Sequence, residues 1–177
     1  DGQVPLVSLL ESALGDLMDE GPLTDAYLAS SGEQRSAIWA RREAAAEIMM
    51  GAGPTVDTDI SVPLDRVGAF LDRALAQLAT IDPGAGTVTV AHLGDGNLHY
   101  SVLATSGDAA LKERIIEGVE DIVADLGGSF SAEHGIGLSK MGSMARRKDP
   151  VALAVMRALK GALDPKGILN PGKVIPD

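Results

Sequence analysis

A pair of histidines flanks a glycine-rich turn, and this pair constrains the fold of the chain more than any other feature. In AHLGDGNLHY (residues 91–100), two alternating runs surround Gly-Asp-Gly-Asn, a composition typical of a β-hairpin. A tight turn centred on Asp95 and Gly96 would place His92 directly opposite His99, with Cβ atoms about 4.5–5.5 Å apart on one face. The sequence therefore predicts an antiparallel hairpin whose two imidazoles are close enough to bind one cation.

A carboxylate close in space would complete a metal site with two histidines and an open position. The 177-residue chain has no cysteine and only three histidines, so a metal must be bound by histidine or carboxylate side chains. Glu133, in the glycine-flanked segment AEHGIG (132–137), is the strongest candidate. Adjacent residues of a strand point to opposite sides, so the third histidine, His134, would face something else, such as a substrate proton. The alternatives are His134 as a fourth ligand, or histidines that bind no metal.

Hydrophobic periodicity predicts an α+β fold, in which helices cover one face of a mainly antiparallel sheet, as in a ferredoxin-like cap. Helices are expected from Pro5 to Gly21, Ser31 to Met50, Pro63 to Leu78 and Leu111 to Leu126, and from Asp149 onward. Strands are expected over residues 24–30, 54–62, 87–105 (as the hairpin) and 128–135. The tail, residues 163–177, is rich in proline and glycine and is expected to be extended. The predicted domains are residues 1–140 and 141–177.

The net charge of the chain and the length of its apolar runs argue against some partners and locations. The formal net charge of −10 repels phosphate backbones, so nucleic acid is not expected as a partner. No apolar run reaches the roughly 18 residues needed to span a bilayer. The N-terminal residues do not resemble a signal peptide, so we predict a cytoplasmic protein. A homodimer formed through helix faces remains open, although no motif supports it.

Arg42 lies three residues after Trp39 and four after Ile38, on the apolar stripe of the second helix. A cation in that place either forms a local salt bridge or binds a substrate carboxylate, for which the planar guanidinium is suited. The neighbouring Arg41 and the Arg146–Arg147 pair are expected to be solvated.

Three motifs, in order, resemble the C-terminal region of FAD-linked 2-hydroxyacid oxidases and dehydrogenases: HLGDGNLH (92–99), AEHGIGLSK (132–140) and ALDPKGILNPGKVIP (162–176). That family includes the glycolate oxidase flavin subunit, D-lactate dehydrogenases and D-2-hydroxyglutarate dehydrogenase. WARRE (39–43) and TDISVPLDRV (58–67) are weaker matches. The resemblance implies an enzyme that oxidises a small 2-hydroxy acid to the 2-oxo acid and transfers a hydride to FAD.

The resemblance also implies roles for single residues. His92, His99 and Glu133 match the ligands of a divalent metal, zinc or manganese. His134 matches the general base, and Arg42 matches the arginine that binds the substrate carboxylate. Cofactor contacts are implied for the NPGK segment, which in the family returns to the flavin domain: Asn170, Gly172 and Lys173. The implied electron acceptor is an electron-transfer flavoprotein, a quinone pathway or a cytochrome.

The chain departs from the family pattern in its extent and at two substrate positions. The N-terminal flavin-binding domain and the strand before the first helix are expected to be missing, so the chain alone should bind FAD poorly and be inactive. The hydroxyglutarate-specific branch has a lysine where Asp57 stands and an asparagine where Ser101 stands. Both differences favour a lactate- or glycolate-like substrate. The rival functions are a metal-dependent hydrolase and a non-catalytic binding domain.

Overall fold

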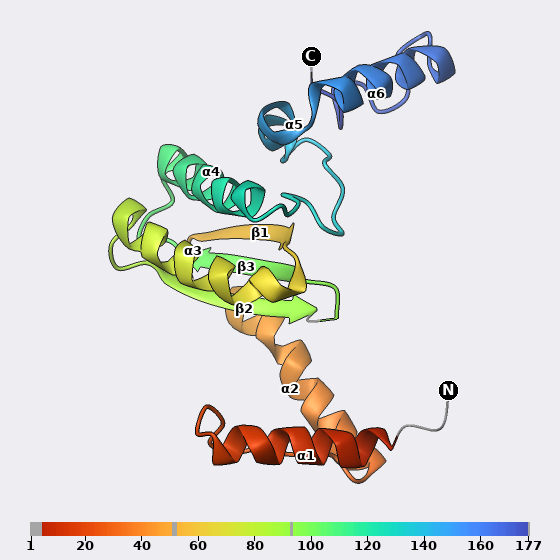
Figure 1. The fold of residues 1–177 in the computed structure, drawn as a ribbon. Coiled ribbons are helices and arrows are strands. Elements are labelled where there is room, and N and C mark those ends of the chain that lie inside the picture. Colours follow the sequence, from red (N-terminus) through yellow and green to blue (C-terminus); the bar gives the residue numbers. More distant parts are fainter. Residues whose placement is uncertain (1–4, 51–52, 93, 177) are drawn as a thin grey trace. The chain divides into compact units, whose positions relative to one another are not determined.

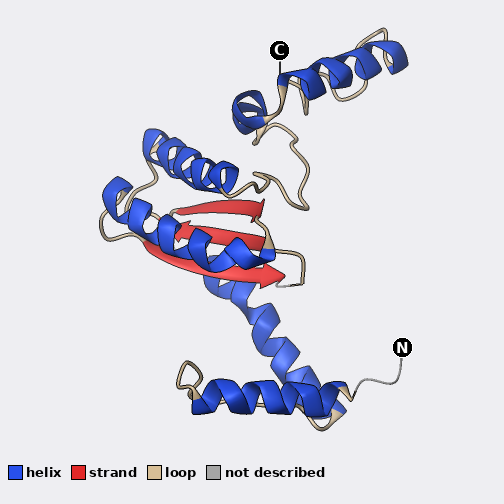
Figure 2. Ribbon diagram, viewed as in Figure 1, coloured by secondary structure: helices blue, strands red, loops and turns tan. Residues whose placement is uncertain are grey.

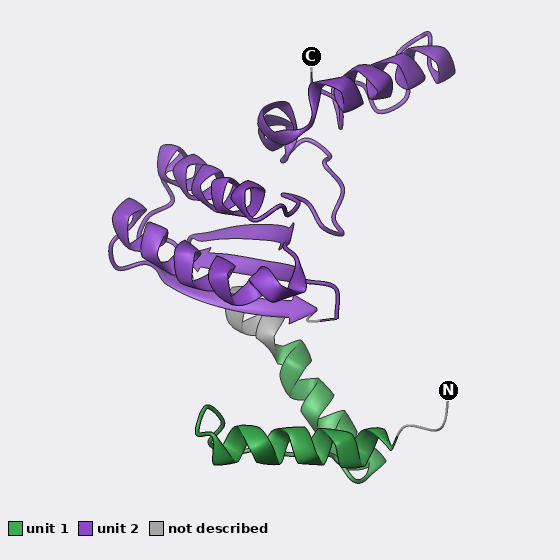
Figure 3. Cartoon of the chain, in the orientation of Figure 1, with its two compact units in different colours: residues 1–50 green, residues 51–177 purple. Residues whose placement is uncertain are grey.

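The chain divides into two compact units, Asp1–Met50 and Gly51–Asp177 (Figure 3). The computed structural model describes residues 5–50, 53–92 and 94–176, with the side chains of residues 45–50 left outside the description. Unit 1 contains α1 (Leu6–Asp19) and α2 (Gly32–Met50), and unit 2 contains the sheet and the other helices. The domain boundary predicted after residue 140 concerns docking on a flavin domain and stays a prediction.

Unit 1 forms both of its predicted helices. The capping box of α2 is confirmed, because the Gln34 N–H donates to Ser31 Oγ and the Ser31 N–H donates to Gln34 Oε1, each at 3.2 Å. The strand predicted over residues 24–30 is wrong, since these residues form an irregular connection. Tyr27 in this segment is 63% exposed, and the described residues offer no neighbouring strand to pair with it.

Unit 2 is built on a three-stranded antiparallel sheet in the order β1-β3-β2, so β3 is the central strand (Figure 1). The predicted α+β class is therefore confirmed. The elements of this part, in chain order, are β1 (Thr55–Ser61), the 3-10 helix η1 (Leu64–Arg66), α3 (Val67–Ile81), β2 (Gly86–His92), β3 (Asn97–Leu103) and α4 (Ala109–Asp125).

The two faces of this sheet differ because successive strand residues point to opposite sides. The apolar face packs against α3 and α4 (Figure 2), and its buried strand residues all have even numbers: Val56, Ile60, Leu98, Tyr100 and Val102. Phe70 of α3 is fully buried there, and its ring packs edge to face against that of Tyr100, with the ring centroids 5.5 Å apart. The opposite face carries the odd-numbered residues of β1 and β3 and the even-numbered residues of β2, which include most of the polar side chains of the strands.

The hairpin register differs from the prediction by two residues. His92 pairs with Asn97, and His99 pairs with Val90, so the strands are not joined by the two-residue turn that was predicted. A shift of two keeps the same parity, so His92 and His99 still share one face, as diagonal neighbours. Gly96 has φ +76° and lies so close to Val62 that a Cβ would be 2.1 Å from the Val62 carbonyl oxygen. Only glycine suits this turn position.

The predicted strand over residues 128–135 is reduced to a single bridge between Ser61 and Ser129. A ferredoxin-like sheet requires a fourth strand at this edge, so that finer part of the prediction is not confirmed for the described residues.

The C-terminal part contains α5 (Met141–Arg147), which was not predicted, and α6 (Pro150–Leu163), which was. Asp149 caps α6 as expected by accepting the Ala152 N–H at 2.9 Å. The tail is a series of turns, so the extended conformation predicted for it is not confirmed. Asp164 holds the first turn by accepting the backbone N–H groups of Ile168 and Leu169 at 3.0 and 2.8 Å.

No helix in the described parts of the chain is long and apolar enough to cross a bilayer.

Candidate metal centre

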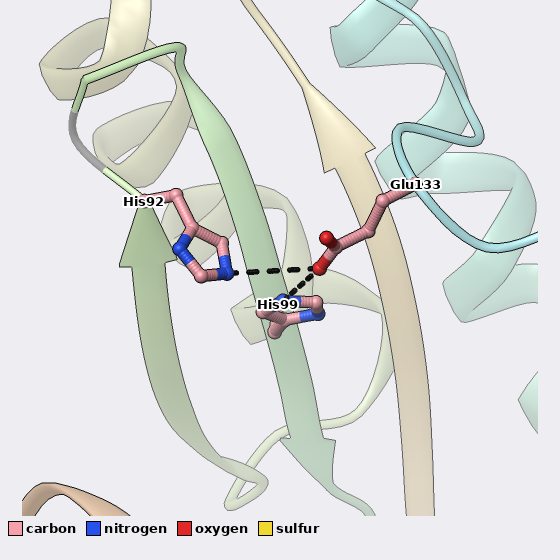
Figure 4. A group of neighbouring side chains, drawn as sticks. All are labelled: His92, His99 and Glu133. Atoms are coloured by element: carbon pink, nitrogen blue, oxygen red, sulfur yellow. Dashed lines mark ion pairs between the residues drawn. The ribbon is translucent and has the colours of Figure 1, made fainter.

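Two histidines of the hairpin and a glutamate from a distant loop come together beside the polar face of the sheet (Figure 4). Glu133 Oε1 lies 2.8 Å from His99 Nε2 and 3.6 Å from His92 Nε2. The two imidazole centroids are 5.5 Å apart, and one ligand atom from each of the three residues lies within 4.8 Å of the other two. The structure thus brings together the three residues predicted as ligands, while their binding of a metal stays a prediction.

The donor set fits a divalent cation. Two imidazole nitrogens and one carboxylate oxygen are the ligands of catalytic zinc sites that leave a position open for water or substrate. The side chains of His92, His99 and Glu133 are 47%, 27% and 49% exposed, so an ion and a small substrate can reach them. Asn97, which pairs with His92, has a buried Oδ1 with no hydrogen-bond partner among the described residues. Such an atom is usually satisfied by ordered water or an ion.

His134 lies beside this group and outside the set of candidate ligand atoms. Its ring centroid is 5.5 Å from that of His99, with the planes inclined by 34°. Its side chain is 64% exposed, and Nδ1 is 3.7 Å from Asp59 Oδ2. Residues 131–134 are not a strand, so alternation does not separate Glu133 from His134, and the ring of His134 lies beside that of His99 with most of its side chain open to solvent.

Sequence reasoning missed Asp59, which holds the loop that carries Glu133 and His134. The carboxylate is almost completely buried and accepts the backbone N–H groups of Glu133 and His134 at 3.2 and 2.8 Å. Lys140 Nζ lies 3.3 Å from the same oxygen. Burial raises the pKa of Asp59, but the His134 amide and Lys140 outweigh burial and hold this pKa below its usual value. One signal was available in the sequence, since Asp59 is an acidic residue in the middle of a predicted strand.

Arg42 is exposed on α2, and its neighbours Ile38 and Trp39 on the same stripe are 39% and 58% exposed. The apolar stripe predicted for this part of α2 is therefore exposed at these three side chains within unit 1. Arg42 and the histidine group belong to different units, each described by itself. Its role as a carboxylate ligand stays a prediction.

The residues implied for the cofactor lie in the C-terminal turns. Asn170, Gly172 and Lys173 line a hollow of about 640 Å³ along α6, together with Arg157 and Lys160. The hollow contains none of the three candidate metal ligands. Contact of these residues with a flavin stays a prediction.

Arg146 and Arg147 are not simply solvated, so that prediction is wrong. Arg146 Nη1 lies 2.7 Å from Glu113 Oε1, and Arg147 Nη2 lies 2.7 Å from Asp121 Oδ1. Both guanidinium groups also approach the buried Glu120 carboxylate, at 3.4 and 3.2 Å. They therefore join α5 to α4.

Comparison with known proteins gives the family. The family described as FAD linked oxidases, C-terminal domain, matches residues 7–174. D-2-hydroxyglutarate dehydrogenase, mitochondrial, from Bos taurus is 39% identical over 92% of this chain and 30% of its own length. The protein of the same name from Danio rerio is 34% identical over 95% of this chain and 31% of its own length. An uncharacterized FAD-linked oxidoreductase from Mycobacterium tuberculosis (strain ATCC 25618 / H37Rv) is 36% identical over 93% of this chain and 35% of its own length.

The chain thus spans about a third of the length of these relatives. The word mitochondrial belongs to the names of the relatives, and the cytoplasmic location of this chain stays a prediction. The resemblance read from the three motifs is confirmed, since the family match covers nearly all of the chain. The chain belongs to the FAD-linked oxidase family and corresponds to its C-terminal domain.

Proposed function

We propose that the chain is the substrate- and metal-binding part of an FAD-dependent 2-hydroxyacid dehydrogenase, which oxidises a small 2-hydroxy acid to the 2-oxo acid. The observation that carries this proposal is the convergence of His92, His99 and Glu133 in a member of the FAD-linked oxidase family. Such a site suits a substrate whose hydroxyl must lose a proton while the neighbouring carbon loses a hydride.

His92, His99 and Glu133 would hold zinc or manganese. A divalent ion held by these residues would lower the pKa of the substrate hydroxyl, and FAD would supply the hydride-accepting chemistry. His134 lies next to the ligand His99 and is open to solvent, so it can take the hydroxyl proton and pass it to water.

The remaining roles follow the family resemblance. Arg42 would bind the substrate carboxylate through its two parallel N–H groups. Asn170, Gly172 and Lys173 would contact the flavin side of the enzyme. Electrons would pass to an electron-transfer flavoprotein or a quinone pathway.

The polar face of the sheet supports a short monocarboxylate as substrate. Asp57 pairs with Ser101 on that face, two residues along the strands from the Asp59–His99 pair. These are the two positions at which the chain departs from the hydroxyglutarate-specific pattern, and they lie side by side. The exposed carboxylate of Asp57 would repel the second carboxylate of hydroxyglutarate. The relatives named for hydroxyglutarate make this choice of substrate the sharpest question about the site.

Kinetics would test the choice of substrate. An FAD-loaded enzyme that contains this chain together with a flavin-binding domain should oxidise D-lactate or glycolate with a higher kcat/KM than D-2-hydroxyglutarate, as measured with an artificial electron acceptor. Asp57→Lys should raise kcat/KM for hydroxyglutarate about tenfold by replacing repulsion with attraction. A wild-type preference for hydroxyglutarate would contradict the proposed substrate class and leave the reaction type intact.

Calorimetric titration of this chain with Zn²⁺ and with Mn²⁺ would test the metal. Wild-type protein should release heat of binding, and His92→Ala should abolish it. His134→Ala is the matched control, because this histidine adjoins the site but is outside the ligand set, so its binding should persist. No heat above buffer for the wild type would contradict the metal assignment. Hydrolysis by flavin-free protein would favour a metal-dependent hydrolase instead.

A further inference from the structure

The side chain of Asp59 is the strongest candidate for an additional role because it is a buried carboxylate next to the proposed site. Its side chain is 4% exposed, in a strand whose next odd-numbered residues are more open. Burying an ionised carboxylate costs several kcal/mol unless other groups pair with it. The groups that pair with Asp59 all come from one loop. Their hydrogen bonds and the Lys140 charge offset the cost of burying its carboxylate.

The contacts of Asp59 define the course of this loop over three consecutive residues. The Ala132 N–H donates to the Asp59 backbone oxygen at 3.1 Å. The next two amides, of Glu133 and His134, both turn toward Asp59 Oδ2. Neighbouring N–H groups that converge on one oxygen form a small anion-binding concavity. The peptide planes on either side of Glu133 are thereby fixed, and they set the direction of its side chain.

Lys140 supplies the compensating charge from the far end of the same motif. Its Nζ lies 3.3 Å from Asp59 Oδ2 and 2.7 Å from Ser131 Oγ. The Ser131 hydroxyl in turn donates to the His134 carbonyl oxygen at 2.5 Å. The loop from Ser131 to His134 is therefore held on both of its sides.

The strand register places Asp59 directly opposite His99. One position along the sheet thus carries a candidate metal ligand on β3 and, on β1, the side chain that holds the loop of another ligand. From this geometry we infer that Asp59, paired with Lys140, is a positioning residue that keeps Glu133 in front of the histidine hairpin. The effect on metal affinity rests on the proposed function, whereas the effect on the loop does not.

The test compares Asp59→Asn with Asp57→Asn in the full 177-residue chain. Both variants remove one negative charge from the same face of β1, but Asp57 is exposed and its side chain interacts with Thr55, not with the loop. Affinity for Zn²⁺ is measured by calorimetry, and ligand geometry by the visible spectrum of bound Co²⁺. Loss of a group that orients ligands typically weakens metal binding about 10–100-fold. We expect this loss and an altered Co²⁺ spectrum for Asp59→Asn, with a change within about twofold for Asp57→Asn.

A double variant, Asp59→Asn with Lys140→Met, covers the case in which the single change prevents folding. It removes both partners together, so no unpaired charge stays buried, and such replacements are often tolerated. Its metal affinity should fall as in the single variant. The backbone hydrogen bond from Ala132 and the Ser61–Ser129 bridge do not involve the altered side chains and should persist.

Amide hydrogen exchange at Glu133 and His134 tests whether Asp59 holds the loop, independently of whether the site binds a metal. If the wild type binds no metal, the proposed function fails, and the inference then depends on exchange alone: both amides should exchange faster in Asp59→Asn than in wild type. Equal exchange rates in the two proteins would overturn the inference. So would an Asp59→Asn protein with wild-type metal affinity and Co²⁺ spectrum, or an equal loss of affinity in Asp57→Asn.

Discussion

The two faces of the sheet use alternate residues of the same strands for different purposes. Ile60 is buried against the helices, whereas its neighbour Asp59 holds the loop beside the candidate metal site. Leu98 and His99 repeat this division on β3. The period of two along a strand lets the chain specify its core and its site almost independently. Changes on one face should therefore alter the free energy of unfolding, and changes on the other should alter binding.

The largest effect is expected for Phe70→Ala, behind the apolar face. Phe70 is fully buried, and truncation of a buried aromatic side chain costs about 3–5 kcal/mol of unfolding free energy. Urea denaturation followed by circular dichroism would measure this loss. Leu75→Ala, on the same helix at a residue 59% exposed, is the control and should change the stability by about 0.5 kcal/mol or less. A Phe70→Ala protein of unchanged stability would show that this face is not the core.

Glu133→Gln, on the polar side of the sheet, should weaken metal binding while leaving the stability of the fold nearly unchanged. The amide retains the shape of the side chain but lacks the negative charge, so the affinity for Zn²⁺ should fall by more than about 100-fold, beyond the effect of an outer-shell residue. The unfolding free energy without metal should change by about 1 kcal/mol or less, because Glu133 is half exposed. Calorimetry and urea denaturation on the same samples give both values. A loss of stability comparable to that of Phe70→Ala would break the comparison between the faces.

Gly96→Ala should affect both the stability of the fold and the candidate metal site. The hairpin turn leads from His92 into β3 and also packs against the chain after β1. The left-handed conformation costs a residue with a Cβ about 1–2 kcal/mol, and the close approach to the Val62 carbonyl adds to this cost. Both stability and Zn²⁺ affinity should fall. Gly94→Ala is the matched control, since nothing lies within 4 Å of its Cβ position. Equal behaviour of the two variants would contradict the assigned role of Gly96.

Tyr100→Phe should have the smallest effect and should stabilise the fold. The Tyr100 hydroxyl is buried on the apolar face and has no hydrogen-bond partner among the described residues. Removing an unsatisfied buried group should add about 1 kcal/mol to the unfolding free energy. A destabilised variant would instead indicate a partner for the hydroxyl.

The pH dependence of Tyr100→Phe provides a second measurement. Burial raises the pKa of Tyr100, so above the usual tyrosine pKa of about 10 the unfolded chain ionises at this residue before the folded chain does. Wild-type stability should therefore fall as the pH rises through this range, until the folded pKa is reached. The difference in stability between the variant and the wild type should widen over the same interval, as measured by urea denaturation on either side of pH 10.

Local patterns in the sequence predicted most of the fold. Helix periodicity and the Ser31–Gln34 capping box located α2, and alternation located all three strands of the sheet. The site was predictable for the same reason, since only parity along the strands was needed to put His92 and His99 on one face. The register error of two residues left that parity intact.

The remaining features depend on contacts between distant segments. The α5 helix is joined to α4 by Arg146 and Arg147. The seven residues of α5 contain two arginines, but this local sequence does not predict acidic partners on another helix. The segment around Tyr27 has strand-like residues but lacks a neighbouring strand among the described residues. The role of Asp59 was hidden because its donors are the backbone amides of a loop far along the chain.

The attachment of this loop at two points fixes how many residues it can contain. Ser129 is bonded to the end of β1, and Glu133 and His134 are bonded to Asp59 a short distance back along that strand. An insertion or deletion of one residue between these points would turn the wrong side chain toward the hairpin and exchange the acid for the imidazole. Related chains with this chemistry should therefore vary in length outside this interval and conserve its length.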